Sequence, residues 1–195
     1  MDFESYRKCA AKTESVPDSI SVPNNLLSPL LLSIAQLTDI VDSIKKNMFY
    51  KKQLMTSEEI TNVLLNVSSL LSDLSKQTNI ANGNKIINDT TSIKLLHSMV
   101  GVITETAGEL PPLITSLLKK QDLDVINLNE EYGDVMWYID RGLDAMNCTV
   151  GQSLDINIDK LSKRYPQGHF DSERANKRDL LSEREVLNQL NTNNY

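Results

Sequence analysis

The chain has 195 residues, of which 40% are hydrophobic and 24% are charged, and its formal net charge is −6. This length suffices for a hydrophobic core without disulfides, and the negative charge argues against a nucleic acid or an anionic membrane as the main partner. The acidic excess lies in the second half, because residues 1–96 hold ten acidic and ten basic residues and residues 97–195 hold sixteen and ten. A cation is therefore expected to bind in the second half.

The two cysteines and the N-terminus indicate where the protein resides. Cys9 and Cys148 lie far apart and lack the spacing of metal ligands, which is typical of reduced thiols. The N-terminus lacks the apolar segment of a signal peptide, and no uninterrupted apolar run reaches the length of about 18 residues that suggests a membrane span. We expect a cytoplasmic protein.

Apolar residues recur at helical spacing along most of the chain, which predicts an all-α fold. Helices are expected at residues 3–12, 26–50, 57–76, 93–110, 114–121, 128–146, 153–165 and 171–190. The segments 15–25 and 78–92 are predicted to be linkers because they are rich in Ser and Asn and interrupted by Pro or Gly. The charged segment 171–185 is expected to be a solvated helix or strap.

Helix ends are predicted from caps and prolines. The residues TSEE at 56–59 are typical of a helix start, and Thr149 is expected to cap the helix that follows it. Pro111 and Pro112 cannot donate backbone hydrogen bonds, so a kink or a break is expected there.

The two halves of the chain show a similar order of helices. Residues 30–54 followed by 60–74 match residues 101–123 followed by 125–139 in apolar phase and approximate spacing. The match indicates either an internal duplication or the chance likeness of Leu/Ile-rich helices.

The predicted regions are 1–82, an N-terminal helical region and acid-free repeat; 83–187, a catalytic helical region; and 188–195, a frayed tail. Together they are expected to form one compact domain.

In the first copy few acidic residues remain at the corresponding places. Asp39 lies near the position of the first acidic burst of the second half, while Asn66 and Ser69 lie where the second burst would be. If the duplication is real, the first copy is expected to act as a scaffold.

Four carboxylates in two short bursts are the most informative feature of the sequence. Glu105 and Glu109 are four residues apart and Glu131 and Asp134 are three apart, so each pair lies on one face of a helix. Two such helices packed face to face would gather four mutually repelling anions, which a hard divalent cation would stabilise. The alternative is that each pair belongs to a solvated helix face.

Several motifs together resemble one superfamily. They are LLHSMVGVITETAGEL, NLNEEYGDVMWYI, NIDKLSKRYPQGHF and NKRDLLSEREVL, which cover about residues 93–187, with FESYRKCAAKTES and KKNMFYKKQL before them. This combination resembles the all-alpha nucleotide pyrophosphohydrolases, the MazG-like and dimeric dUTPase-like superfamily, and in particular its small phage-type members. The resemblance places the protein in the cytoplasm of a bacterium or of a phage-infected host cell.

The resemblance implies a helical bundle of MazG-like type that uses Mg²⁺, with Mn²⁺ as an alternative, to hydrolyse a nucleoside triphosphate to monophosphate and pyrophosphate. Deoxynucleotides such as dUTP or dCTP are candidate substrates. The resemblance also implies a homodimer or a higher homo-oligomer. A protein that has lost activity and only binds a nucleotide or a partner is the alternative, and a helical assembly protein is a third.

The family's metal ligands come from an EExxE and an ExxD motif. ExxD corresponds to Glu131 and Asp134, and EExxE corresponds to Glu105 through Glu109 with Thr106 at its second position. Alternatively, against the phage-type pattern GxxTEAGE, one residue is inserted between Glu105 and Gly108. A π-bulge could absorb the additional residue, since such bulges are frequent at functional sites. The alternative is a weakened or lost metal site.

Substrate contacts are also implied by the resemblance. Asn157, Lys160 and Arg164 share one helical face, and the family's phosphate or sugar contacts come from this face together with Tyr165. Arg178 is a further candidate. Lysine supplies a point charge for phosphate, and arginine supplies a forked donor.

Two roles stay open at the level of the sequence. The general base that takes a proton from the attacking water is either Glu105 or Glu130. Trp137 either lines a base-stacking pocket or belongs to the core.

Overall fold

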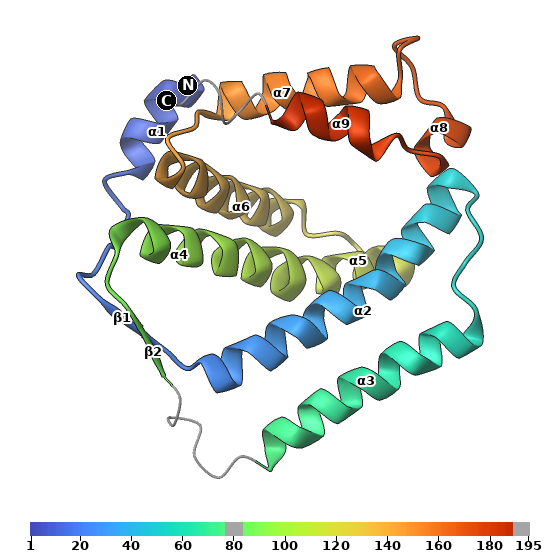
Figure 1. Cartoon of the computed structure of the whole chain (residues 1–195), viewed down its shortest axis with the longest axis horizontal. Coiled ribbons are helices and arrows are strands. Elements are labelled where there is room, and N and C mark those ends of the chain that lie inside the picture. Colours follow the sequence, from blue (N-terminus) through green and yellow to red (C-terminus); the bar gives the residue numbers. More distant parts are fainter. Residues whose placement is uncertain (77–83, 189–195) are drawn as a thin grey trace. The chain divides into compact units, whose positions relative to one another are not determined.

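The computed structural model describes residues 1–76 and 84–188, and in this part of the chain the fold is all-α, as predicted (Figure 1). Two short strands, β1 (Ile20–Val22) and β2 (Lys85–Ile87), pair with each other and are the only strands among the described residues. The predicted boundary near residue 82 lies outside the described residues, and so does the predicted tail from residue 189 onward.

The chain divides into two compact units. The first contains Met1–Ile20 and Ile87–Ile158, and the second contains Ser21–Ile86 and Asp159–Leu187. Helices of the first unit are α1 (Phe3–Ala10), α4 (Thr90–Thr104), the π-helix η1 (Glu105–Glu109), α5 (Leu110–Leu118) and α6 (Val125–Ala145). Helices of the second unit are α2 (Asn24–Tyr50), α3 (Ser57–Ser75), α8 (Ser172–Asn176) and α9 (Leu180–Leu187), and α7 (Val150–Arg164) begins in the first unit and ends in the second.

Close packing of α4 against α6 organises the first unit (Figure 1). A Cβ atom added to Gly101 would overlap the ring of Tyr138, and one added to Gly142 would overlap the Ser98 hydroxyl. The Ser98 hydroxyl donates a hydrogen bond to the Tyr138 carbonyl at 2.8 Å. Glycines at these two positions therefore let the helix backbones approach closely.

A hairpin of α2 and α3 organises the second unit. The predicted helix start at residue 56 is confirmed, because Thr56 and Glu59 form a capping box. The backbone N–H of Met55 donates to the Ser43 hydroxyl at 2.9 Å, which fastens the connection to α2.

By length and composition, α2 could also cross a membrane. Its 27 residues include an 18-residue window of mean hydropathy 1.3, although every uninterrupted apolar run in it is short. A core helix of a soluble protein satisfies the same criterion, so this finding leaves the cytoplasmic location as a prediction.

The two long hairpins have similar dimensions. Asn24–Tyr50 and Ser57–Ser75 form one, and Thr90–Leu118 and Val125–Ala145 form the other, with connections of equal length at 51–56 and 119–124. Counted from the first residue of each second helix, Glu131 corresponds to Val63 and Asp134 to Asn66. The duplication itself stays a prediction.

Three predicted elements differ from the structure. Both predicted linkers contain a strand, because β-branched residues such as Ile20, Val22 and Ile87 favour extended backbone. The predicted final helix is split into α8 and α9, since Asp171 and Asp179 each accept a backbone hydrogen bond and start a new helix. Thr149 does cap α7, as predicted, by accepting from the backbone N–H of Gln152 at 3.1 Å.

Candidate metal-binding site

The first acidic burst forms a π-helix. Glu105–Glu109 make up η1 between α4 and α5, where the helix widens to a π-helical turn. The predicted π-bulge is confirmed. Pro111 and Pro112 lie in the first turn of α5, where a missing N–H donor is tolerated, and η1 interrupts the regular α-helix just before them.

Threonine hydroxyls hydrogen-bond to carbonyls at the start of this turn. Thr104 donates to the Gly101 carbonyl at 2.8 Å, and Thr106 donates to the Val102 carbonyl. Thr106 occupies the second position of the first acidic motif. Its hydroxyl therefore supports the backbone at a position where the related motif has a carboxylate.

Three carboxylates converge from η1 and α6. One oxygen atom each from Glu105, Glu131 and Asp134 lies within 4.8 Å of the other two. Glu131 is 7% exposed, Glu105 is half-buried and Asp134 is exposed, so the group opens to solvent on one side. Three of the four predicted ligands are thus brought together.

Glu131 has no neutralising partner. Among the described residues, its carboxylate forms no hydrogen bond, and no lysine or arginine forms an ion pair with any of the three clustered acids. Burial raises the pKa of Glu131 above its ordinary value, and neighbouring carboxylates raise that pKa further. In decreasing order of effect these neighbours are Glu109, Glu105, Glu130 and Asp134.

Glu109 and Glu130 lie at the edge of this group. Both are exposed, and Glu109 does not belong to the three acids whose oxygens converge. Glu109 is nevertheless the neighbour whose charge affects Glu131 most. The donor set consists of carboxylates alone, which fits a hard cation such as Mg²⁺ or Mn²⁺ better than zinc.

The indole N–H of Trp137 forms a hydrogen bond within the protein. Its indole N–H donates to the Thr13 hydroxyl at 3.0 Å, and its ring makes edge-on contacts with His97 and Tyr138 at centroid distances of 5.7 and 5.0 Å. These contacts favour a structural role over a base-stacking one.

The predicted substrate contacts, apart from Asn157, belong to the second unit, whereas the clustered acids belong to the first. Asn157 is exposed and Lys160 is half-buried on α7. The Tyr165 ring lies 5.8 Å from the Phe170 ring, between centroids. The structure therefore describes these residues within their own unit only.

Two of these residues share one carboxylate. Arg164 donates to both oxygens of Glu183, at 2.9 and 2.8 Å, and Arg178 donates to the same two oxygens. These hydrogen bonds lower the pKa of Glu183 to about 2. Glu183 is 3% exposed, and the sequence analysis missed it because it assigned its segment to solvent. The sequence signal for burial of this helix face was the apolar Val186, which lies about one turn after Glu183 and is also buried.

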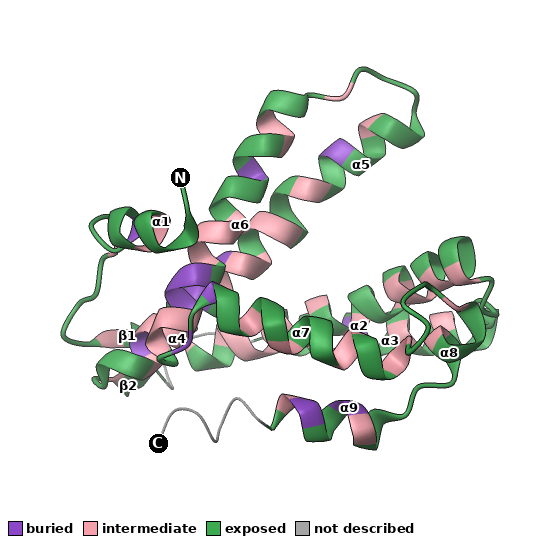
Figure 2. Cartoon of the chain, turned by 90° about the horizontal axis from the view of Figure 1, so that it is seen from above, coloured by how far each residue is buried: buried purple, intermediate pink, exposed green. Residues whose placement is uncertain are grey.

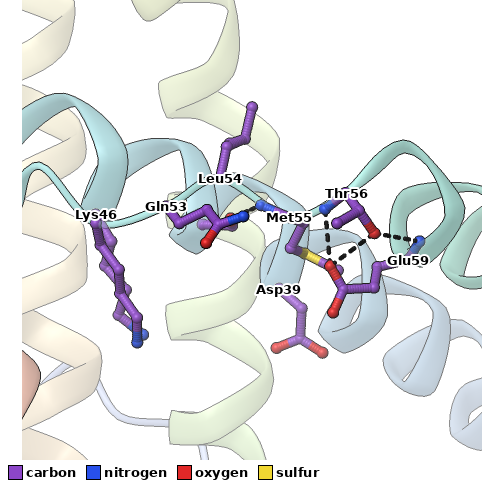
Figure 3. A pocket seen from close by; sticks show the side chains of 9 residues that line it. Asp39, Lys46, Gln53, Leu54, Met55, Thr56 and Glu59 are labelled. Atoms are coloured by element: carbon purple, nitrogen blue, oxygen red, sulfur yellow. Dashed lines mark hydrogen bonds between the residues drawn. The ribbon is translucent and has the colours of Figure 1, made fainter.

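A separate cavity lies in the second unit. Its volume is about 390 Å³, and Asp39, Lys46 and the connection before α3 line it (Figure 3). Several of its polar groups are already bonded within the chain, as Figure 3 shows for Glu59 and Thr56. Since this cavity lacks a cluster of carboxylates, the acids on η1 and α6 remain the candidate site.

Comparison of the chain with models of known protein families, with characterised proteins and with solved structures gave no match.

Proposed function

We propose that the chain is a Mg²⁺-dependent nucleoside triphosphate pyrophosphohydrolase of the all-alpha, MazG-like superfamily. The observation that supports this proposal is the convergence of the Glu105, Glu131 and Asp134 carboxylates, which form no ion pair with a lysine or arginine among the described residues. Carboxylates brought this close together repel one another, and a hard divalent cation relieves that repulsion. The motif resemblance supplies the reaction.

The residues have separable roles in this proposal. Glu105, Glu131 and Asp134 would hold the cation, and Glu109 would add negative charge beside them. When bound, Mg²⁺ supplies charge neutralisation on the phosphates and acidifies the attacking water. By holding the cation, these three carboxylates would fix the position of the phosphates. Positioning is the main requirement of phosphoryl transfer. Exposed Glu130 or half-buried Glu105 would accept the proton of the water.

A substrate panel tests the activity. The protein is incubated with each common NTP and dNTP, with and without Mg²⁺, and pyrophosphate and the nucleoside monophosphate are measured. Release of both in equal amounts, dependent on Mg²⁺ and lost in Asp134→Asn, is expected. No release from any nucleotide by folded protein would overturn the proposal.

The second candidate is a protein that binds a nucleotide without hydrolysing it. It is favoured by the altered first acidic motif, in which Thr106 stands at the second position and its hydroxyl donates to the Val102 carbonyl. Calorimetry distinguishes the two candidates. Nucleotide binding with no pyrophosphate release supports the binder, whereas turnover that Glu131→Gln abolishes supports the enzyme.

A further inference from the structure

The most deeply buried charges of the described chain lie on α6, beyond the candidate metal ligands. Asp140 is fully buried and Arg141 is 2% exposed, and with Gly142 they form a buried stretch of α6 that is purple in Figure 2. The two charged side chains pair with each other. Burial of an ion pair contributes little stability by itself, so its retention calls for a separate role.

These charges bind the N-terminal segment Phe3–Glu14. The Arg7 guanidinium donates to the Asp140 carboxylate at 3.1 Å and to the Cys148 carbonyl at 2.7 Å. In return, the Arg141 guanidinium donates to the Arg7 carbonyl at 3.3 Å. Arg7 is therefore held by its side chain and by its backbone.

Glu14 connects the same network to α4. Its carboxylate lies 3.5 Å from the guanidinium of Arg141 and 3.3 Å from the ammonium of Lys94. The Lys94 ammonium also lies 3.6 Å from the Asp144 carboxylate of α6. The N-terminal segment therefore joins the two helices that carry the clustered acids.

The helical spacing relates this network to the candidate ligands. Arg141 follows Asp134 by about two turns, and Lys94 precedes Glu105 by about three, so each charge shares a helix face with a ligand. Fixing Arg141 against Lys94 through Glu14 thus fixes the separation of α4 from α6. That separation determines whether Glu105, Glu131 and Asp134 can share one cation.

We propose that the N-terminal segment Phe3–Glu14 positions the metal ligands, with Arg7 and Glu14 holding α4 and α6 at the separation that the cation requires. The proposal rests on the metal site of the proposed function. Arg7 and Glu14 are positioning residues, because they act through α4 and α6 and do not touch the cation. Residues that orient metal ligands typically change metal affinity by about 10- to 100-fold when they are replaced.

The test measures Mn²⁺ affinity by electron paramagnetic resonance, which reports free Mn²⁺ without any need for turnover. Arg7→Met is compared with Lys8→Met, which removes the same charge from the next residue of α1, where Lys8 is exposed and pairs only with Glu4. We expect Mn²⁺ affinity to fall at least about tenfold in Arg7→Met and less than about twofold in Lys8→Met. Arg7→Lys should recover part of the loss, because lysine keeps the charge but not the fork.

If Arg7→Met does not fold, Glu14→Gln is the deciding variant, since it leaves the Arg7–Asp140 pair in place and removes the ion pairs of Glu14 with Arg141 and Lys94. Circular dichroism first establishes that each variant is folded at the temperature of the titration. Wild-type Mn²⁺ affinity in a folded Arg7→Met or Glu14→Gln protein, whatever its melting temperature, overturns the positioning role and leaves the proposed function standing. Failure of the wild-type protein to bind Mn²⁺ overturns both.

Discussion

At the scale of single residues, Glu131 lowers the stability of the metal-free protein and at the same time favours a bound cation. Glu131 is 7% exposed, lies beside other carboxylates and has no cationic partner among the described residues. Its pKa is raised, which means that the ionised form disfavours the folded state while no cation is bound. The residue that most favours a bound cation therefore weakens the metal-free protein.

We expect Glu131→Gln to raise the melting temperature of the metal-free protein by a few degrees, because one of several crowded charges is removed. The same variant should lose the increase in melting temperature that Mg²⁺ gives to the wild-type protein. Differential scanning calorimetry with and without Mg²⁺ measures both effects. Asp155→Asn, at an exposed position of α7, is the control for loss of a carboxylate. A lower melting temperature together with a retained Mg²⁺ effect would contradict the assignment.

At the scale of secondary-structure elements, the close approach of α4 and α6 depends on glycine. Gly101→Ala should destabilise the protein by about 1–3 kcal/mol, because the new methyl group overlaps the Tyr138 ring and pushes the helices apart. Urea unfolding measures the loss, and Mn²⁺ affinity should fall with it. Gly133→Ala is the matched control, since no atom lies within 4 Å of its added Cβ, and it should stabilise α6 by about 0.5–1 kcal/mol.

The attachment of α9 depends on pH through Glu183. Because its pKa is lowered from 4.5 to about 2, its contribution to stability is fully present above pH 4.5 and is lost as the pH falls from 4.5 toward 2. Urea unfolding of the wild-type protein between pH 2 and 6 should show this loss, and Glu183→Gln should remove it. Glu185→Gln, at an exposed position of the same helix, should leave it unchanged. Equal pH profiles for all three proteins would rule out this role of Glu183.

At the scale of the whole molecule, many large apolar side chains are exposed to solvent. On α2, Val41, Ile44 and Met48 are 63%, 43% and 55% exposed and lie on one helix face. Exposed apolar faces of this kind mark interaction surfaces, which agrees with the expected homo-oligomer. Light scattering should report a dimer or a larger species, and Val41→Lys should reduce its size. Ala35→Lys adds the same charge to the far side of α2 and should not. A monomer at every concentration would contradict the expectation.

The sequence predicts those features that depend on local chemistry. Helical periodicity predicts α2, α3 and α6, and threonine or aspartate caps predict where helices begin. The widened turn at Glu105–Glu109 is predictable because the spacing of a motif differs by one residue. Long-range pairings leave no such local signal. The sequence therefore does not reveal that Arg7 meets Asp140 across the chain.

The π-helix has a consequence for how sites of this kind are recognised. Because η1 confines one additional residue to a single turn, the helices on either side keep their own periodicity, and the carboxylates still converge. A search that assumes a regular α-helix through this segment would place the residues after η1 on the wrong helix face. Distances between carboxylate oxygens, compared without regard to their separation along the chain, would recover the site.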